Sequence, residues 1–136
     1  GFPAAVKWRS VAEGGPGARY AVANGAEGEP GTFKDRALMR ANPYAVLEGL
    51  LIAAAAVGAR HAFIALKASF EPELTAIRRA LSEIDEAGWL EGIEVTVVTG
   101  PEEYLFGEEK ALLEVMVAAV SPRPVRHRSP ARLAGP

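Results

Sequence analysis

The segment Asn24–Arg36, which reads N-G-A-E-G-E-P-G-T-F-K-D-R, holds the side chains best suited to bind a ligand. Glu27 and Glu29 lie two residues apart, and alternate side chains of an extended chain point the same way, so the carboxylates would form paired acceptors on one surface. Glycines let the backbone approach a ligand and Pro30 fixes one φ angle, so we expect a rigid turn suited to hydroxyl-rich or amide-bearing ligands. The alternative is an acidic turn that is merely exposed to solvent.

The elements that would position this turn follow from the apolar pattern of the chain. Apolar or β-branched segments predict three strands, at Tyr20–Ala23, His61–Leu66 and Ile93–Val98. Apolar residues at helical spacing predict three helices: one from near Pro43 to Gly58, one over Leu74–Ile84 that stops by Gly88, and one over Glu108–Val120. Strands that alternate with helices predict an α/β fold, a Rossmann-like open parallel sheet with flanking helices.

In such a sheet, ligands bind outside the carboxyl ends of the strands. Asn24 and the turn after it follow the first predicted strand, and Gly107, Glu108 and Glu109 open the last predicted helix, so both motifs should lie at this edge. Glutamates in a first turn also stabilise a helix through its macrodipole, by about 0.3–1 kcal/mol. Taken alone, Glu108 and Glu109 are equally well explained as a helix start.

Four motifs, in order along the chain, resemble one protein family. They are G-F-P-x-x-x-K-W at Gly1–Trp8, E-G-E-P-G-T-F-K-D-R at Glu27–Arg36, N-P-Y-x-V-L-E-G at Asn42–Gly49 and Y-L-F-G-E-E-K-A-L-L at Tyr104–Leu113. With them, the chain resembles the NADH- and flavin-binding subunit of respiratory complex I and its relatives in NAD-linked hydrogenases and formate dehydrogenases. The resemblance spans nearly the whole chain and is loosest after Val120.

The resemblance implies that FMN and NADH bind stacked against each other and that hydride passes from NADH to the flavin. The cofactor then performs the chemistry, and no catalytic side chain is expected. By this resemblance, the residues that would contact FMN are Lys7, Asn24, Gly107 and Glu108. Those that would line the NADH side are Phe2, Glu27, Glu29 and Glu109. Lys7 would meet the phosphate or the polar edge of the flavin, and Phe2 would stack on a ring.

The same resemblance implies partners. The family passes electrons onward to an iron–sulfur cluster, and this chain has no cysteine, so any cluster is expected in a domain downstream of these residues. The chain begins within the first motif, so we expect a fragment of a longer subunit that works with other subunits of an electron-transfer complex. We expect that parent to be an NADH:quinone oxidoreductase-type flavoprotein, and this stretch alone to be inactive.

Several positions depart from the family pattern. Ala4 and Ala5 stand where Thr-Gly is usual, Ala26 replaces an aspartate expected to contact the flavin, and Lys110 replaces a threonine. Each lost hydrogen bond to a charged group weakens binding by about 1.5–3 kcal/mol. Two alternatives therefore stay open: a degenerate relative that acts as a structural or partner-binding module, and an unrelated doubly wound nucleotide-binding domain.

Composition sets further limits. With 136 residues and 49% hydrophobic content the chain can bury one core, which we assign to an FMN/NADH-binding-type domain over residues 1–120, followed by a basic, proline-rich tail or linker over residues 121–136. The arginines of the tail lack interleaved aromatic residues and a recognition helix, so we expect no nucleic-acid binding. His61 and His127 lack partners at metal-ligand spacing. No apolar run spans a membrane, so we expect a cytoplasmic protein held at the membrane only through partner subunits.

Overall fold

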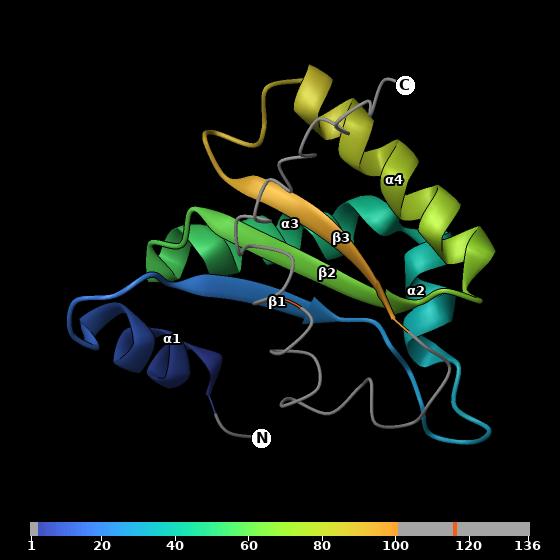
Figure 1. Cartoon of the computed structure of the whole chain (residues 1–136), viewed down its shortest axis with the longest axis horizontal. Coiled ribbons are helices and arrows are strands. Elements are labelled where there is room, and N and C mark those ends of the chain that lie inside the picture. Colours follow the sequence, from blue (N-terminus) through green and yellow to red (C-terminus); the bar gives the residue numbers. More distant parts are fainter. Residues whose placement is uncertain (1–2, 101–115, 117–136) are drawn as a thin grey trace, which may run out of the picture.

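The computed structural model describes residues 3–100 and Met116. Three strands form one sheet in the order β1-β2-β3, with β1 at Tyr20–Asn24, β2 at His61–Lys67 and β3 at Glu94–Gly100. Both pairings are parallel. The predicted strands and the predicted Rossmann-like parallel sheet with flanking helices are confirmed (Figure 1).

Helices α3 (Pro43–Val57) and α4 (Glu71–Glu86) connect the strands and cover one face of the sheet. Helix α3 begins where it was predicted, because the Asn42 side chain accepts a hydrogen bond from the backbone N–H of Ala45 and Pro43 fits the first turn. It ends at Gly58, whose φ of 70° is the left-handed conformation that terminates helices. The second predicted helix is confirmed as α4.

Two further helices were not predicted. Helix α1 (Ala4–Glu13) flanks the β1 edge of the sheet, and α2 (Lys34–Ala41) lies near the carboxyl ends of the strands (Figure 1). Both helices are short, of ten and eight residues; α1 buries no residue and α2 buries only Met39, so each offers few apolar positions from which a helical period could be recognised. Met116 is helical, in agreement with the helix predicted over Glu108–Val120, whose other residues lie outside those described.

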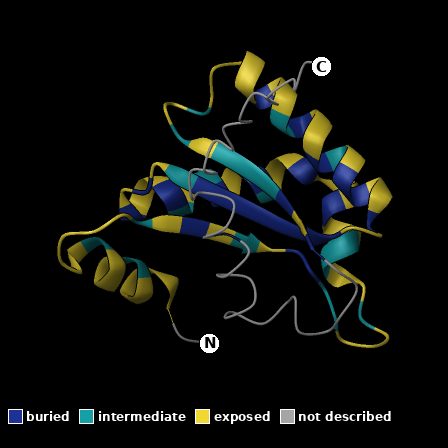
Figure 2. Ribbon diagram, viewed as in Figure 1, coloured by how far each residue is buried: buried dark blue, intermediate teal, exposed yellow. Residues whose placement is uncertain are grey.

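The central strand is buried on both faces (Figure 2). Ala62, Ile64 and Leu66 belong to the main core, which lies beneath α3 and α4. Phe63 and Ala65 point the other way and form a smaller cluster with Ala26, Val98 and Met116. Both crossover helices cover the first face, and Met116 packs against the second. Within residues 3–100, no helix has the length and apolarity needed to cross a membrane.

Candidate functional site

The loop after β1 leaves the sheet along a path fixed by short-range contacts. Gly25 donates its backbone N–H to the carbonyl oxygen of Ala65 at 2.8 Å, which extends the pairing of β1 with β2. The Asn24 side chain accepts a hydrogen bond from the backbone N–H of Ala26 at 3.2 Å. A Cβ on Gly25 would lie 3.1 Å from Met39 Sδ and 3.2 Å from the Ala65 carbonyl oxygen, so a larger residue would force the neighbours apart. The loop is therefore anchored at the carboxyl edge of the sheet.

Ala26, where the family resemblance led us to expect an aspartate, is part of a hydrophobic cluster. Its exposed fraction is 2%, and it packs with Phe63, Val98 and Met116. A carboxylate at this position would lose its hydration among apolar side chains, which is costly unless it finds a polar partner. Alanine therefore suits the apolar packing between the loop and the sheet. It offers no hydrogen-bonding side chain to a ligand.

The two carboxylates of the loop have different surroundings. Glu27 is half-buried, and its two oxygens accept the backbone N–H groups of Asp35 and Arg36 at 3.3 and 3.5 Å. N–H groups in a first helical turn have no partner within the helix, so Glu27 caps α2 from the preceding loop. Glu29 is exposed, and within the described part of the chain its carboxylate accepts no hydrogen bond. The two carboxylates expected to act as a pair of acceptors therefore differ: Glu27 is bonded to α2, and Glu29 is exposed.

A buried carboxylate on α4 holds the other side of α2. Glu73 is fully buried, and its Oε1 accepts hydrogen bonds from Arg36 Nε at 3.0 Å and Arg40 Nε at 2.6 Å. Burial by itself raises the pKa of Glu73, but hydrogen bonds from its own backbone N–H and from Arg40 and Arg36 outweigh burial, so the net pKa lies below its ordinary value. Arg36 also lies 4.5 Å from the centre of the Phe70 ring. Helix α2 is thus attached to the loop by its backbone and to α4 by its side chains.

Sequence reasoning did not single out this cluster. Arg36 and Arg40 are four residues apart, a spacing that places them on the same side of a helix, and this signal was present in the sequence. The carboxylate that they share comes from another helix, 37 residues beyond Arg36. No local pattern connects them.

The end of β2 adds a buried cation to the same edge. Lys67 is 8% exposed, and its ammonium lies 5.9 Å from the centre of the Phe70 ring. Lys67 is paired in register with Gly100, whose carbonyl accepts the backbone N–H of Ala68 at 2.9 Å. Sequence reasoning missed Lys67 as well, because it ends a nearly continuous apolar segment and no motif marks it.

The remaining predicted site residues lie on α1 or outside the described residues. Lys7 is exposed on α1, and Trp8 beside it packs against the main core. Phe2, Gly107, Glu108, Glu109 and Lys110 are not among the described residues, so their roles and their approach to the loop stay predictions.

The described residues contain no candidate metal centre. No group of three metal-ligating side chains is found among residues 3–100 and Met116. His61 pairs with Glu94 at 3.2 Å, at the amino ends of the strands, on the opposite edge from the loop.

Comparison with known proteins gives consistent matches. The family model described as the Nuo51 FMN-binding domain matches residues 1–132. One subunit of NADH-quinone oxidoreductase from Aquifex aeolicus is 35% identical over 122 residues, which cover 84% of this chain and 28% of that protein. The corresponding subunit from Streptomyces coelicolor is 38% identical over 122 residues, which cover 84% of this chain and 27% of that protein. The crystal structure of an NAD+-reducing [NiFe]-hydrogenase in the H2-reduced state superposes with a TM-score of 0.76 at 36% identity, over 84% of this chain and 20% of that one.

Proposed function

Because this chain belongs to the family of Nuo51 FMN-binding domains, we propose that it forms the FMN- and NADH-binding domain of an NADH-oxidising flavoprotein subunit. The names of its relatives support this function, and so does the fold that it shares with an NAD+-reducing hydrogenase. The chain spans 27–28% of the length of those two relatives, so the activity of a whole subunit is part of the proposal. The observation that carries it is the segment Asn24–Arg36, which contains the family motif Glu27–Arg36 and is anchored at the carboxyl edge of a parallel sheet.

The described residues fit the ring of FMN better than its phosphate. Gly25 keeps the backbone close to the carboxyl edge of the sheet, and Asn24 adds an amide side chain there. Uncharged polar groups of this kind suit the uncharged flavin ring. A phosphate prefers a helix N-terminus, but of the helices that follow strands at this edge, α2 is capped by Glu27 and α4 carries Glu71 and Glu73 in its first turn. Lys7, which matches the family motif, is therefore our candidate for the phosphate.

When bound, FMN supplies the ability to take a hydride from NADH and release electrons one at a time. The residues of this chain would bind and orient the two nucleotides. Asn24, Gly107 and Glu108 are proposed for the flavin, and Phe2, Glu29 and Glu109 for NADH. Glu27 keeps a proposed NADH role too, because a carboxylate has about four lone-pair sites and α2 occupies only some of them.

Met116 supports the proposed approach of Gly107–Glu109 to the loop. It belongs to the segment predicted to form one helix with those residues, and it packs in one cluster with Ala26, two residues after Asn24. The start of such a helix and the loop would then lie on the same face of the sheet.

The surroundings of the domain are also part of the proposal. Both relatives are named as one subunit of a larger enzyme, which supports partner subunits. The family resemblance is the basis for proposing an iron–sulfur cluster held outside these residues and a peripheral position on the cytoplasmic face of a membrane. We place the domain boundary at residue 120, with residues 121–136 as a basic tail or linker.

One observation favours the second candidate, a relative that keeps the fold without electron transfer. Ala26 is built into a hydrophobic cluster, so the loop lacks the carboxylate that the resemblance led us to expect near the flavin.

A chimera separates these two functions. In the Aquifex aeolicus relative, the segment matched by this chain is replaced by the chain itself, and flavin content and NADH oxidation by ferricyanide are compared with the native protein. We expect the chimera to retain flavin and activity. We expect Asn24→Ala to weaken FMN binding at least tenfold, and Glu29→Gln to raise the KM for NADH with flavin content unchanged. A chimera with native circular dichroism but no flavin would identify this chain as a structural module.

A further inference from the structure

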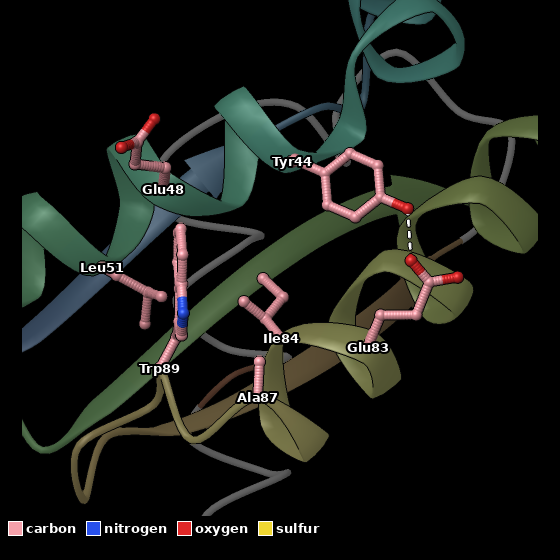
Figure 3. Close-up of a pocket in the computed structure, with 7 residues that line it drawn as sticks. All are labelled: Tyr44, Glu48, Leu51, Glu83, Ile84, Ala87 and Trp89. Atoms are coloured by element: carbon pink, nitrogen blue, oxygen red, sulfur yellow. Dashed lines mark hydrogen bonds between the residues drawn. The ribbon is translucent and has the colours of Figure 1, made fainter.

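Helices α3 and α4 and the loop after α4 enclose an apolar groove, called here the α3–α4 groove (Figure 3). One cleft, of about 320 Å³, is lined by Tyr44 and Leu51 of α3, Ile84 of α4, and Trp89. A second cleft, of about 340 Å³, shares Leu51 and Trp89 and continues along Ile52 and Ile93. The groove follows α3 from Tyr44 to Ala55, which corresponds to ~16 Å of helix.

Trp89 stands between the two clefts and is 62% exposed. Its position is fixed by the end of α4: Trp89 donates its backbone N–H to the carbonyl of Ile84 at 3.0 Å, and Gly88 donates to Asp85 at 2.9 Å. This is the Schellman arrangement, in which Gly88 takes a φ of 76° and the next residue contacts the last turn of the helix. The motif explains the contact between Trp89 and Ile84, but it leaves most of the indole in solvent. Ile52 of α3, which lines the second cleft together with Trp89, is 53% exposed.

The border of the groove is acidic. Three glutamates line the two clefts, Glu48, Glu83 and Glu91, and among the described residues no lysine or arginine does. Glu83 accepts a hydrogen bond from the Tyr44 hydroxyl and lies 3.8 Å from Arg79. Glu48 and Glu91 are exposed and have no hydrogen bond or ion pair with the described residues. An apolar floor with unpaired carboxylates at its border is complementary to a chain that carries apolar and basic side chains.

The same charges argue against other occupants. Anionic lipid headgroups and nucleic acids would be repelled by the glutamates. A second copy of this groove would place like charges opposite each other. The basic tail of this chain has suitable charge, but Met116, the last described residue before it, packs on the face of the sheet opposite to α3 and α4. A segment from another protein reaches the groove without crossing the sheet.

We propose that the α3–α4 groove binds a basic, amphipathic segment of a partner protein, whose apolar side chains enter the clefts beside Trp89 and whose lysines or arginines meet Glu48 and Glu91. The proposal does not depend on flavin binding, because no residue of the groove belongs to the carboxyl-edge site.

The test uses the full chain and two synthetic peptides, K-L-K-K-F-K-K-L and its acidic counterpart E-L-E-E-F-E-E-L, with affinity measured by calorimetry. We expect the basic peptide alone to bind, more tightly at low salt than at high salt. Glu48→Lys combined with Glu91→Lys should weaken binding at least tenfold, and so should Trp89→Ala. Glu13→Lys and Phe33→Ala, which change an exposed charge and an exposed ring outside the groove, should leave the affinity within twofold.

Four results would overturn the proposal. They are absence of binding by the basic peptide, equal binding by the acidic one, unchanged affinity in the Glu48→Lys/Glu91→Lys variant, and tenfold tighter binding by a chain that stops at Ser121, which would assign the groove to the chain's own tail. A fifth result would also overturn it: a dimer of the native chain that Trp89→Ala dissociates would assign the groove to a second copy. Because Trp89 and Glu48 are exposed, these variants should fold, and circular dichroism of each one checks this.

Discussion

The carboxyl edge of the sheet and the α3–α4 groove use carboxylates in different ways. At the edge, Glu27 and Glu73 accept hydrogen bonds from α2 and attach that short helix to the rest of the molecule. In the groove, Glu48 and Glu91 are exposed and unpaired within the described residues. The comparison indicates that an acidic side chain stabilises the fold where hydrogen-bond donors of the same chain surround it. Where apolar surface surrounds it instead, the carboxylate stays available to a partner.

The comparison predicts its largest effect at Glu73. Changing both Arg36 and Arg40 to Met leaves a buried carboxylate without its charged partners, and we expect the free energy of unfolding to fall by about 3 kcal/mol, the lower end of the range for such a change since the arginines reach solvent. Urea unfolding measures it. Adding Glu73→Leu should restore most of the loss, because a buried ion pair can often be replaced by apolar residues. If the triple variant is as unstable as the double variant, the ion pairs are not the cause.

The pH dependence of stability should change sign between the native chain and that double variant. The folded pKa of Glu73 lies below its ordinary value of 4.5, so its contribution is complete above that value and is lost as the pH falls through the folded pKa. Without the arginines, burial raises the pKa of Glu73, and acidification should then stabilise the variant as Glu73 becomes neutral. Unfolding curves recorded from neutral to acidic pH compare the two, and parallel curves would contradict the assignment.

A smaller effect separates the two carboxylates of the loop. Glu27→Ala removes the cap of α2 and should lower the free energy of unfolding by about 1 kcal/mol. Glu29→Ala, the same truncation in the same loop, should change it by less than about 0.5 kcal/mol. Thermal unfolding of both variants tests this. Equal losses would mean that Glu29 also supports the fold, and the unequal roles proposed for the pair would be wrong.

The smallest effect is expected in the groove. Glu48→Gln should leave the free energy of unfolding within about 0.5 kcal/mol of the native value, because the side chain is exposed and pairs with nothing described. A loss near that of Glu27→Ala, measured by the same thermal unfolding, would place Glu48 among the carboxylates that stabilise the fold.

Features with local signals were predicted from the sequence. The start of α3 follows from Asn42 and Pro43, and its end follows from Gly58, whose left-handed conformation suits glycine. Each β-strand appears as a short apolar or β-branched segment, because strands packed beneath helices need such residues. Helices α1 and α2 were missed because they are short and bury almost nothing, so few residues carry their apolar signal.

By itself, the sequence determined the parallel sheet, the position of the Asn24–Arg36 segment at its carboxyl edge and the family resemblance. Strand periodicity, helix caps and motifs each depend on residues that are close together in the chain, so they can be recognised without the fold. Only the tertiary structure separated Glu27 from Glu29 and paired Glu73 with the arginines of α2. Glu27 bonds to a helix eight residues ahead, and Glu73 bonds across 37 residues. A side-chain hydrogen bond depends on positions within about 3 Å, and such positions are set when helices and strands pack against each other.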